Sequence, residues 1–302
     1  MTGSSRGSGG REPFGARLAA AMAAHGPLCV GIDPHPALLS AWGLADDPAG
    51  LRSFALTVLE AVGGRVAAVK PQSALFERHG SRGVAVLEEV VAAGRETGTL
   101  VVVDAKRGDI GSTMDAYADA YLRDGSPLAG DALTVSPFLG FGSLAPAVEA
   151  ARATGRGLFV LALTSNPEGA QVQHATEPDG TSVAARIARE VGLLNAADLA
   201  GLNGADGATA HVLGSFGLVV GATIGDAAQH LGIDLSAVQG PLLAPGVGAQ
   251  GAGAAELAQV FGASRRAVLA SSSRGVLRAG PAVEAIREAA LRAGEDAATA
   301  LT

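Results

Sequence analysis

The stretch VVVDAKRGDIGST, residues 101–113, places four charged side chains within six residues, directly after an apolar run. Asp104 and Lys106 are two positions apart, so in a strand they would share one face. A carboxylate beside a lysine favours the charged form of both groups, which keeps the lysine protonated and able to donate a proton. The pattern therefore indicates proton-transfer chemistry. A structural salt-bridge network, with Asp109 and Lys70 as further members, is the alternative.

A second stretch, APGVGAQG at residues 244–251, carries the glycine spacing of a dinucleotide-binding turn. That interpretation fails in this context, because the acidic residue expected about twenty positions later is missing. Glycine-rich turns at helix starts also bind single phosphate groups, and Arg274 in SSSRG adds a forked donor. We expect a phosphomonoester site from Gly246, Gly248, Gln250 and Arg274. Ordinary turns and a surface arginine are the alternative.

Both stretches follow short apolar runs, and such runs recur along the chain, each before a turn and a helical pattern. The runs are apolar throughout, as in parallel strands covered on both faces. The pattern predicts a single-domain α/β fold, a (β/α)8 TIM barrel, with a doubly wound open sheet as the alternative. The expected strands are residues 28–33, 66–70, 100–106, 131–137, 157–163, 217–222, 241–246 and 267–273.

Polar side chains stand at the carboxyl ends of these expected strands. In such barrels the chemistry lies at that end, so these groups should converge on one mouth. They are Asp33, Lys70, Asp104 with Lys106, Ser136, Thr164 with Ser165, Gly246, and Ser273 with Arg274.

Periodicity and composition suggest the boundaries of the domain. Phe14, Leu18 and Met22 recur on one helical face, which predicts a helix over residues 13–25 after a disordered tail at 1–12. We expect the barrel over 13–292, an Ala-rich tail at 293–302, and a loop at 164–180.

The charge and composition of the chain limit the classes of partner that it is expected to bind. The net charge is −7 and there is no basic block, which argues against nucleic acid or an anionic membrane as the main partner. No apolar stretch approaches the ~20 residues that span a bilayer. The single Cys29 is expected to be a small buried apolar residue in a reducing compartment, the cytoplasm. No recognisable metal-ligand pattern is present, so no metal is expected.

Taken together, DAKRGDIGST, VKPQSALFE, GIDPHP, LTSNPEG, APGVGAQG and SSSRG resemble the orotidine 5′-phosphate decarboxylase family, most closely its longer-chain bacterial branch (type 2). The resemblance covers about residues 13–292. It implies a homodimeric barrel without cofactor or metal. It also implies that orotidine 5′-phosphate is converted to UMP and CO2, the last step of de novo pyrimidine synthesis.

The resemblance also implies roles for individual residues. Lys106 would protonate C6 of the pyrimidine, Asp104 would lie beside the substrate carboxylate, and Lys70 would link Asp104 to the ribose. Asp109 and Thr113 would reach into the partner's active site. Asp33 would contact a ribose hydroxyl, Ser165 the pyrimidine ring, and Gln250 with Arg274 the phosphate. Arg107 receives no role, and Asn166 and the long segment through 180 depart from the shorter branch of the family.

Two alternatives come from other functional classes. The first is a Mg2+-dependent decarboxylase of the 3-keto-L-gulonate 6-phosphate type, which shares the charged array but lacks the long TSNPEG segment. The second is a non-catalytic barrel that binds phosphoribosyl ligands. Lys106 and Asp104 argue against the second, because a carboxylate aimed at an anionic ligand would only weaken binding.

Overall fold

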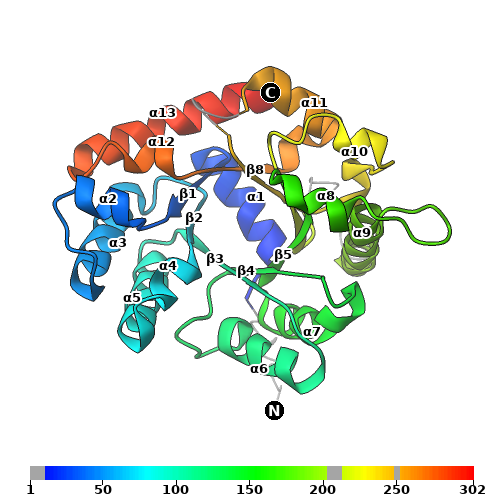
Figure 1. The fold of residues 1–302 in the computed structure, drawn as a ribbon, viewed down its shortest axis with the longest axis horizontal. Helices are drawn as coiled ribbons and strands as arrows, with labels where there is room; N and C mark the ends of the chain where they lie inside the picture. Colours follow the sequence, from blue (N-terminus) through cyan, green and yellow to red (C-terminus); the bar gives the residue numbers. More distant parts are fainter. Residues whose placement is uncertain (1–10, 203–212, 248–251) are drawn as a thin grey trace, which may run out of the picture.

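A computed structural model describes residues 11–202, 213–247 and 252–302 of the chain. In this part of the chain, eight parallel strands follow one another in chain order around a closed barrel, which confirms the predicted fold (Figure 1). Each strand overlaps one of the expected apolar runs. The strands are β1 (Leu28–Ile32), β2 (Ala68–Pro71), β3 (Leu100–Arg107), β4 (Ala132–Val135), β5 (Gly157–Leu163), β6 (Phe216–Val220), β7 (Leu242–Pro245) and β8 (Val268–Ser272).

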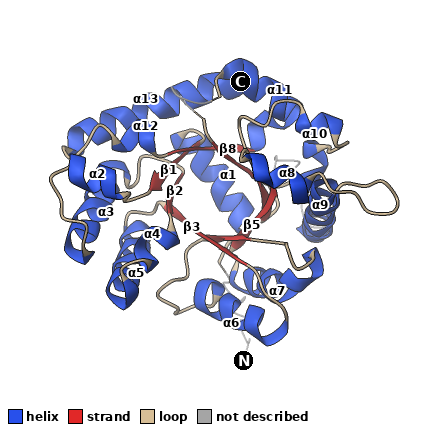
Figure 2. Cartoon of the chain, viewed as in Figure 1, coloured by secondary structure: helices blue, strands red, loops and turns tan. Residues whose placement is uncertain are grey.

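Helices form an outer layer around the strands (Figure 2). Local signals start some of them: before α3, the Asp47 side chain accepts a hydrogen bond from Gly50 N at 2.8 Å, and Pro48 takes the first helical position. The helices are α1 (Phe14–His25), α2 (Pro36–Ala41), α3 (Pro48–Val62), α4 (Ser73–Glu77), α5 (Gly80–Glu96), α6 (Gly111–Leu122), α7 (Ala145–Thr154), α8 (Ala170–Gln173), α9 (Val183–Leu202), α10 (Ala227–His230), α11 (Ala254–Phe261), α12 (Arg274–Leu277) and α13 (Val283–Leu301). None of the helices in the described ranges is long and apolar enough to cross a membrane.

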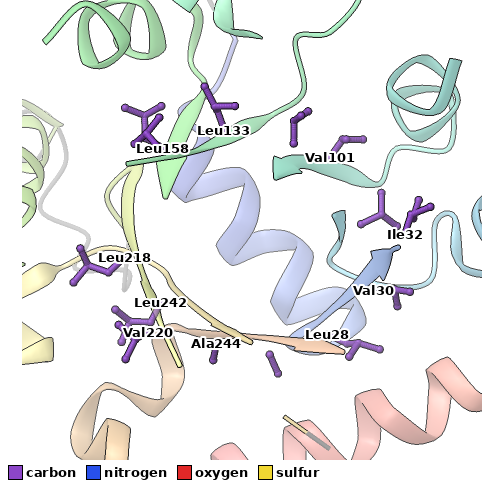
Figure 3. Packing of buried hydrophobic residues seen from close by; sticks show 14 of the residues in the cluster. Leu28, Val30, Ile32, Val101, Leu133, Leu158, Leu218, Val220, Leu242 and Ala244 are labelled. Carbon is purple, nitrogen blue, oxygen red and sulfur yellow. The ribbon is translucent and has the colours of Figure 1, made fainter. Parts of the chain in front are cut away.

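Alternate strand residues belong to two separate cores. Leu28, Val30 and Ile32 of β1 point outward and pack in the layer between strands and helices (Figure 3). Cys29, between them in sequence, lies in the core inside the barrel. It is fully buried, as expected, and burial raises the pKa of its thiol to about 12. The same alternation decides which polar side chains at the strand ends face the barrel axis.

The helix α1 closes the amino-terminal end of the barrel, and in Figure 1 it lies across the ring of strands. Phe14 and Leu18 are fully buried in the inner core, and the Phe14 ring meets Phe159 edge-on at 5.9 Å between centroids. Arg17 pairs with Asp131 just before β4 and donates to Gly155 O at 3.0 Å. The predicted helix is confirmed, and its apolar face fills this end of the barrel.

The carboxyl-terminal boundary differs from the expected one. The segment 293–302 is not a tail, because α13 continues to Leu301 and buries Ala297 and Leu301. Alanine is the strongest helix former, so an Ala-rich end extends a helix when some of its residues can pack. Of the expected amino-terminal tail, residues 1–10 lie outside the described part of the chain.

The segment after β5, expected to be a loop, contains short helical turns. A 3-10 turn at Pro167–Gly169 and α8 interrupt it. The Gln173 side chain accepts from Thr164 N at 2.9 Å and donates to Thr164 Oγ1 at 2.6 Å. These bonds join α8 back to the residue that follows β5.

Candidate active site

Three neighbouring strands bring charged and polar side chains together at the carboxyl end of the barrel. On β3, Asp104 and Lys106 continue the inward positions of Leu100 and Val102, which line the inner core. Lys70 follows the inward-facing Ala68 on β2. The alternation therefore turns all three charged groups toward the axis, as predicted for Asp104 and Lys106.

Asp104 lies between the two lysines. Lys70 Nζ is 2.8 Å from Asp104 Oδ2, and Lys106 Nζ is 2.6 Å from Asp104 Oδ1. The side chains of Lys70 and Asp104 are 7% and 8% exposed, whereas that of Lys106 is 44% exposed. Lys106 is thus the most exposed member of the array at the mouth.

The lysines and the carboxylate keep one another charged. Burial by itself raises the pKa of Asp104, but Lys70 and Lys106 lower it well below its ordinary value of 3.8. Burial by itself lowers the pKa of Lys70, but Asp104 and Asp33 outweigh burial and raise it above the ordinary 10.5. The buried pair is therefore ionised across the neutral range.

Two further side chains bind Asp104, and the sequence analysis missed both. Gln72 Nε2 donates to Asp104 Oδ2 at 3.1 Å, and Thr134 Oγ1 donates to Oδ1 at 2.9 Å. Thr134 lies two residues after Ala132, an inward position of β4, so the alternation could have identified it. With these bonds the carboxylate has four donors, which is ample for two oxygens.

The backbone at Lys106 is unusual. Its φ is +48°, in the left-handed region that non-glycine residues rarely adopt. Val103 pairs with Leu133 but Arg107 pairs with Val135, so β3 carries two extra residues at this point. Lys106 N donates to Thr134 Oγ1 at 2.9 Å, and this bond helps to hold the strained conformation.

At the end of β1, the structure leaves a polar atom without a partner. Asp33 Oδ1 is buried and accepts no hydrogen bond from any described residue. Nearby Gly31 leaves room for Ser273, because a Cβ on Gly31 would lie 1.9 Å from Ser273 Oγ. Buried carboxylate oxygens normally have a partner, so this oxygen is an acceptor that a further hydrogen-bond donor could satisfy.

The expected phosphate-binding residues are described in part. Gly246 follows β7 with φ +93°, and Arg274 begins α12 after the neighbouring strand β8. The Arg274 side chain is exposed, and among the described residues it has no hydrogen-bond or ion-pair partner. Gly248 and Gln250 lie outside the described residues.

Three other predicted residues lie around the mouth without joining the charged array. Ser165 follows β5 and is exposed. Asp109 accepts from Ile110 N at 2.8 Å, and Thr113 is exposed on the first turn of α6. Within one chain, then, no ion pair of the described part joins Asp109 to Lys70 or Lys106, so the expected four-membered network has three members here.

A (β/α)8 barrel with an exposed lysine bonded to a buried carboxylate at its mouth defines a class of enzyme that performs proton transfer at that end. Residues 26–289 match the sequence model of the "Orotidine 5'-phosphate decarboxylase / HUMPS family", and the chain belongs to this family.

Individual relatives are similar to this chain in sequence over most of its length. An orotidine 5′-phosphate decarboxylase of Streptomyces coelicolor is 59% identical over 96% of this chain and 99% of its own length. One from Nocardioides is 61% identical over 88% and 92%. A crystal structure from Streptomyces avermitilis, 60% identical, has a TM-score of 0.89 over 97% of each chain. The OMP decarboxylase of Leishmania donovani is 29% identical, with a TM-score of 0.69 over 94% and 97%.

Proposed function

We propose that this chain is an orotidine 5′-phosphate decarboxylase, a carboxy-lyase that forms UMP and CO2 in the last step of de novo pyrimidine synthesis. The relatives of this name, 59% identical over nearly the full length of both chains, support it. The observation that carries it is the array at the mouth: a protonatable Lys106 that is exposed to a ligand and lies 2.6 Å from Asp104.

The array can perform this reaction with its own residues. When the bond between C6 and the carboxylate breaks, its electron pair stays on C6. The Lys106 ammonium stabilises this carbanion and then donates a proton to it, after which solvent protonates the lysine again. Asp104 lies where it would repel the substrate carboxylate, so it disfavours the bound substrate relative to the carbanion.

The remaining side chains of the mouth bind the rest of the substrate in this proposal. Lys70 and Asp33 contact the ribose, and Asp33 Oδ1, which has no partner among the described residues, supports that role. Ser165 contacts the pyrimidine. Arg274, exposed and unpaired among the described residues, binds the phosphate together with Gly246, Gly248 and Gln250.

We further propose a homodimer in which Asp109 and Thr113 complete the partner's site. Near them, Ile110, Phe138 and Leu139 are 62%, 74% and 52% exposed. They follow the adjacent strands β3 and β4, whose connections touch, since a Cβ on Gly108 would lie 2.3 Å from Ser136 O. Large apolar side chains exposed together are typical of a surface that a partner covers.

One assay tests the function and the expected independence from metal. Purified protein is mixed with orotidine 5′-phosphate, and the fall in substrate absorbance is followed with and without EDTA. We expect equal rates. Activity that EDTA abolishes and Mg2+ restores, or turnover of 3-keto-L-gulonate 6-phosphate instead, would favour the gulonate-type enzyme. Binding of UMP without turnover would favour the non-catalytic barrel.

In the described part of the chain, no cluster of three or more His, Cys, Asp or Glu could hold a metal. The compartment we propose is the cytoplasm, where the single thiol of Cys29 would stay reduced.

A further inference from the structure

Arg107 is the charged residue of DAKRGD that the proposed reaction does not use. Its side chain points outward between helices rather than into the mouth, because its partners lie on α4 and α6. It pairs with Glu77 and donates to the Tyr121 hydroxyl at 3.0 Å. Its guanidinium carbon lies 5.4 Å and 5.5 Å from the ring centroids of Tyr117 and Tyr121.

These contacts join three segments that carry site residues or lie next to them. Glu77 ends α4, which begins three residues after Lys70, and Ser73 Oγ donates to Glu77 Oε1 at 2.6 Å. Tyr117 and Tyr121 lie on α6, which begins directly after the segment 108–110. Arg107 itself is the residue next to Lys106. A single side chain therefore connects α4 and α6 to the end of β3.

The segment 108–113, which we call the arm, leaves β3 and runs into the first turn of α6. Among the described residues, the Asp109 side chain accepts a hydrogen bond only from the neighbouring Ile110 N, and Gly111 has φ +50°. Lys106, in contrast, is held directly by Asp104 and Thr134. Loss of Arg107 should therefore displace the arm more than it displaces Lys106.

We propose that Arg107 is a positioning residue that orients the arm, with Asp109 and Thr113, toward the partner subunit's active site. The inference rests on the proposed function and on its homodimer. The planar guanidinium can bind a carboxylate and a hydroxyl while it packs on two aromatic rings, which a lysine ammonium cannot do in the same geometry.

The first part of the test compares two arginines that have the same kind of contacts. Arg152 pairs with Asp198 at 2.9 Å, and its guanidinium lies 5.4 Å from the Phe216 ring centroid, but it is on α7 near the other end of the barrel. Arg107→Met should lower kcat/KM about 10- to 100-fold, because a displacement of about 1 Å costs that much. Arg152→Met should change it less than about threefold, and Arg107→Lys should fall between.

The second part of the test asks whether Arg107→Met damages the active site of its own subunit or that of the partner subunit. Two different affinity tags purify mixed dimers after unfolding, mixing and refolding. When Arg107→Met is paired with Lys106→Ala, the one competent site takes its arm from the Lys106→Ala chain, where Arg107 is intact. About half of the wild-type activity should return. When Arg107→Met is paired with Asp109→Ala, the one competent site takes its arm from the Arg107→Met chain, and activity should stay low.

Each other result overturns the inference. If Arg107→Met is fully active, or if both mixed dimers are equally impaired, Arg107 does not act through the arm. The reverse asymmetry would mean that it acts on Lys106 of its own chain, and failure to form dimers would leave the arm without a target. An inactive wild-type protein would refute the proposed function itself, which separates the two failures.

Discussion

At the scale of the residue, Asp104 is the group on which the site depends. Its two oxygens accept from Lys70, Lys106, Gln72 and Thr134, so one carboxylate sets the positions of side chains from β2, β3 and β4. Its burial makes these bonds strong and also makes an unpaired lysine costly, because a buried charge without a partner has lost its hydration.

The dependence of stability on pH tests this role. Because the folded pKa of Asp104 is lowered, its stabilisation is complete above the ordinary value of 3.8 and is lost as the pH falls through the folded pKa. Asp104→Asn should lower the free energy of unfolding at pH 7 by about 3–5 kcal/mol. That difference from wild type should shrink below about pH 3.8.

Urea unfolding at pH 7 and pH 3 provides the measurement. Asp198→Asn, which removes a carboxylate paired with Arg152 at the surface, is the matched control and should change stability much less. A wild-type-to-Asp104→Asn difference that is equal at both pH values would contradict the assigned pKa shift.

The role of Arg274 in the proposed phosphate site can be tested by comparing the binding of UMP with that of uridine. A charge-assisted contact to phosphate contributes about 2–3 kcal/mol, so Arg274→Ala should raise the Kd for UMP about 30- to 150-fold. Binding of uridine, which lacks the phosphate, should change little. Isothermal titration gives both constants, with Arg266→Ala, an exposed arginine before β8, as the control. Equal losses for both ligands would show that Arg274 does not contact the phosphate.

At the scale of the element, the two ends of the barrel have separate tasks. The helix α1 fills the amino-terminal end with Phe14 and Leu18, while the carboxyl-terminal end holds the charged array. Stability and chemistry therefore depend on different residues. The bulge in β3 belongs to the second task, because it turns Lys106 into its left-handed conformation at the mouth.

Substitutions of two leucines test whether the amino-terminal end of the barrel contributes to stability and not to catalysis. Leu18→Ala removes a fully buried side chain and should lower the free energy of unfolding by about 2–5 kcal/mol. Leu193 on α9 is 57% exposed, and Leu193→Ala should change it by less than about 0.5 kcal/mol. Both variants should keep their kcat at a temperature where they are folded. A large fall in kcat for folded Leu18→Ala would contradict the separation of the two ends.

At the scale of the whole molecule, the proposed site is incomplete in one chain. Asp109 and Thr113 lie beside an exposed apolar surface, and Asp109 makes no ion pair with the array within the described residues. In the proposed homodimer, covering that surface would also bring the arm of one subunit to the mouth of the other.

Complementation between inactive chains tests the shared site. Lys106→Ala and Asp109→Ala should each be nearly inactive, with kcat for Lys106→Ala lowered at least ~10³-fold because this lysine both stabilises and protonates the carbanion. After equal mixing, unfolding and refolding, about half the dimers are mixed and one site in each is intact. About a quarter of the wild-type activity should return. If subunit exchange is verified and no activity returns, both residues serve the same chain's site.

Local spacing in the sequence was sufficient to predict much of the barrel and part of its charged array. Apolar runs of strand length predicted all eight strands, and the two-residue spacing of Asp104 and Lys106 predicted their shared face. The Ala-rich end was misjudged, because composition does not reveal that Ala297 and Leu301 find a surface to pack against.

Alternation along a strand is a property of the backbone, so the sequence by itself determined that Asp104 and Lys106 share a face, and their residue types indicated acid–base chemistry. Only the tertiary structure decided that Lys70, Asp104 and Thr134, each about thirty residues from the next, meet at one carboxylate. It also decided that Arg107 pairs with Glu77 on the outer side of the strand. The reason is physical: local preferences follow from neighbouring residues, whereas contacts between distant segments depend on strand register and on the packing of helices around the closed barrel.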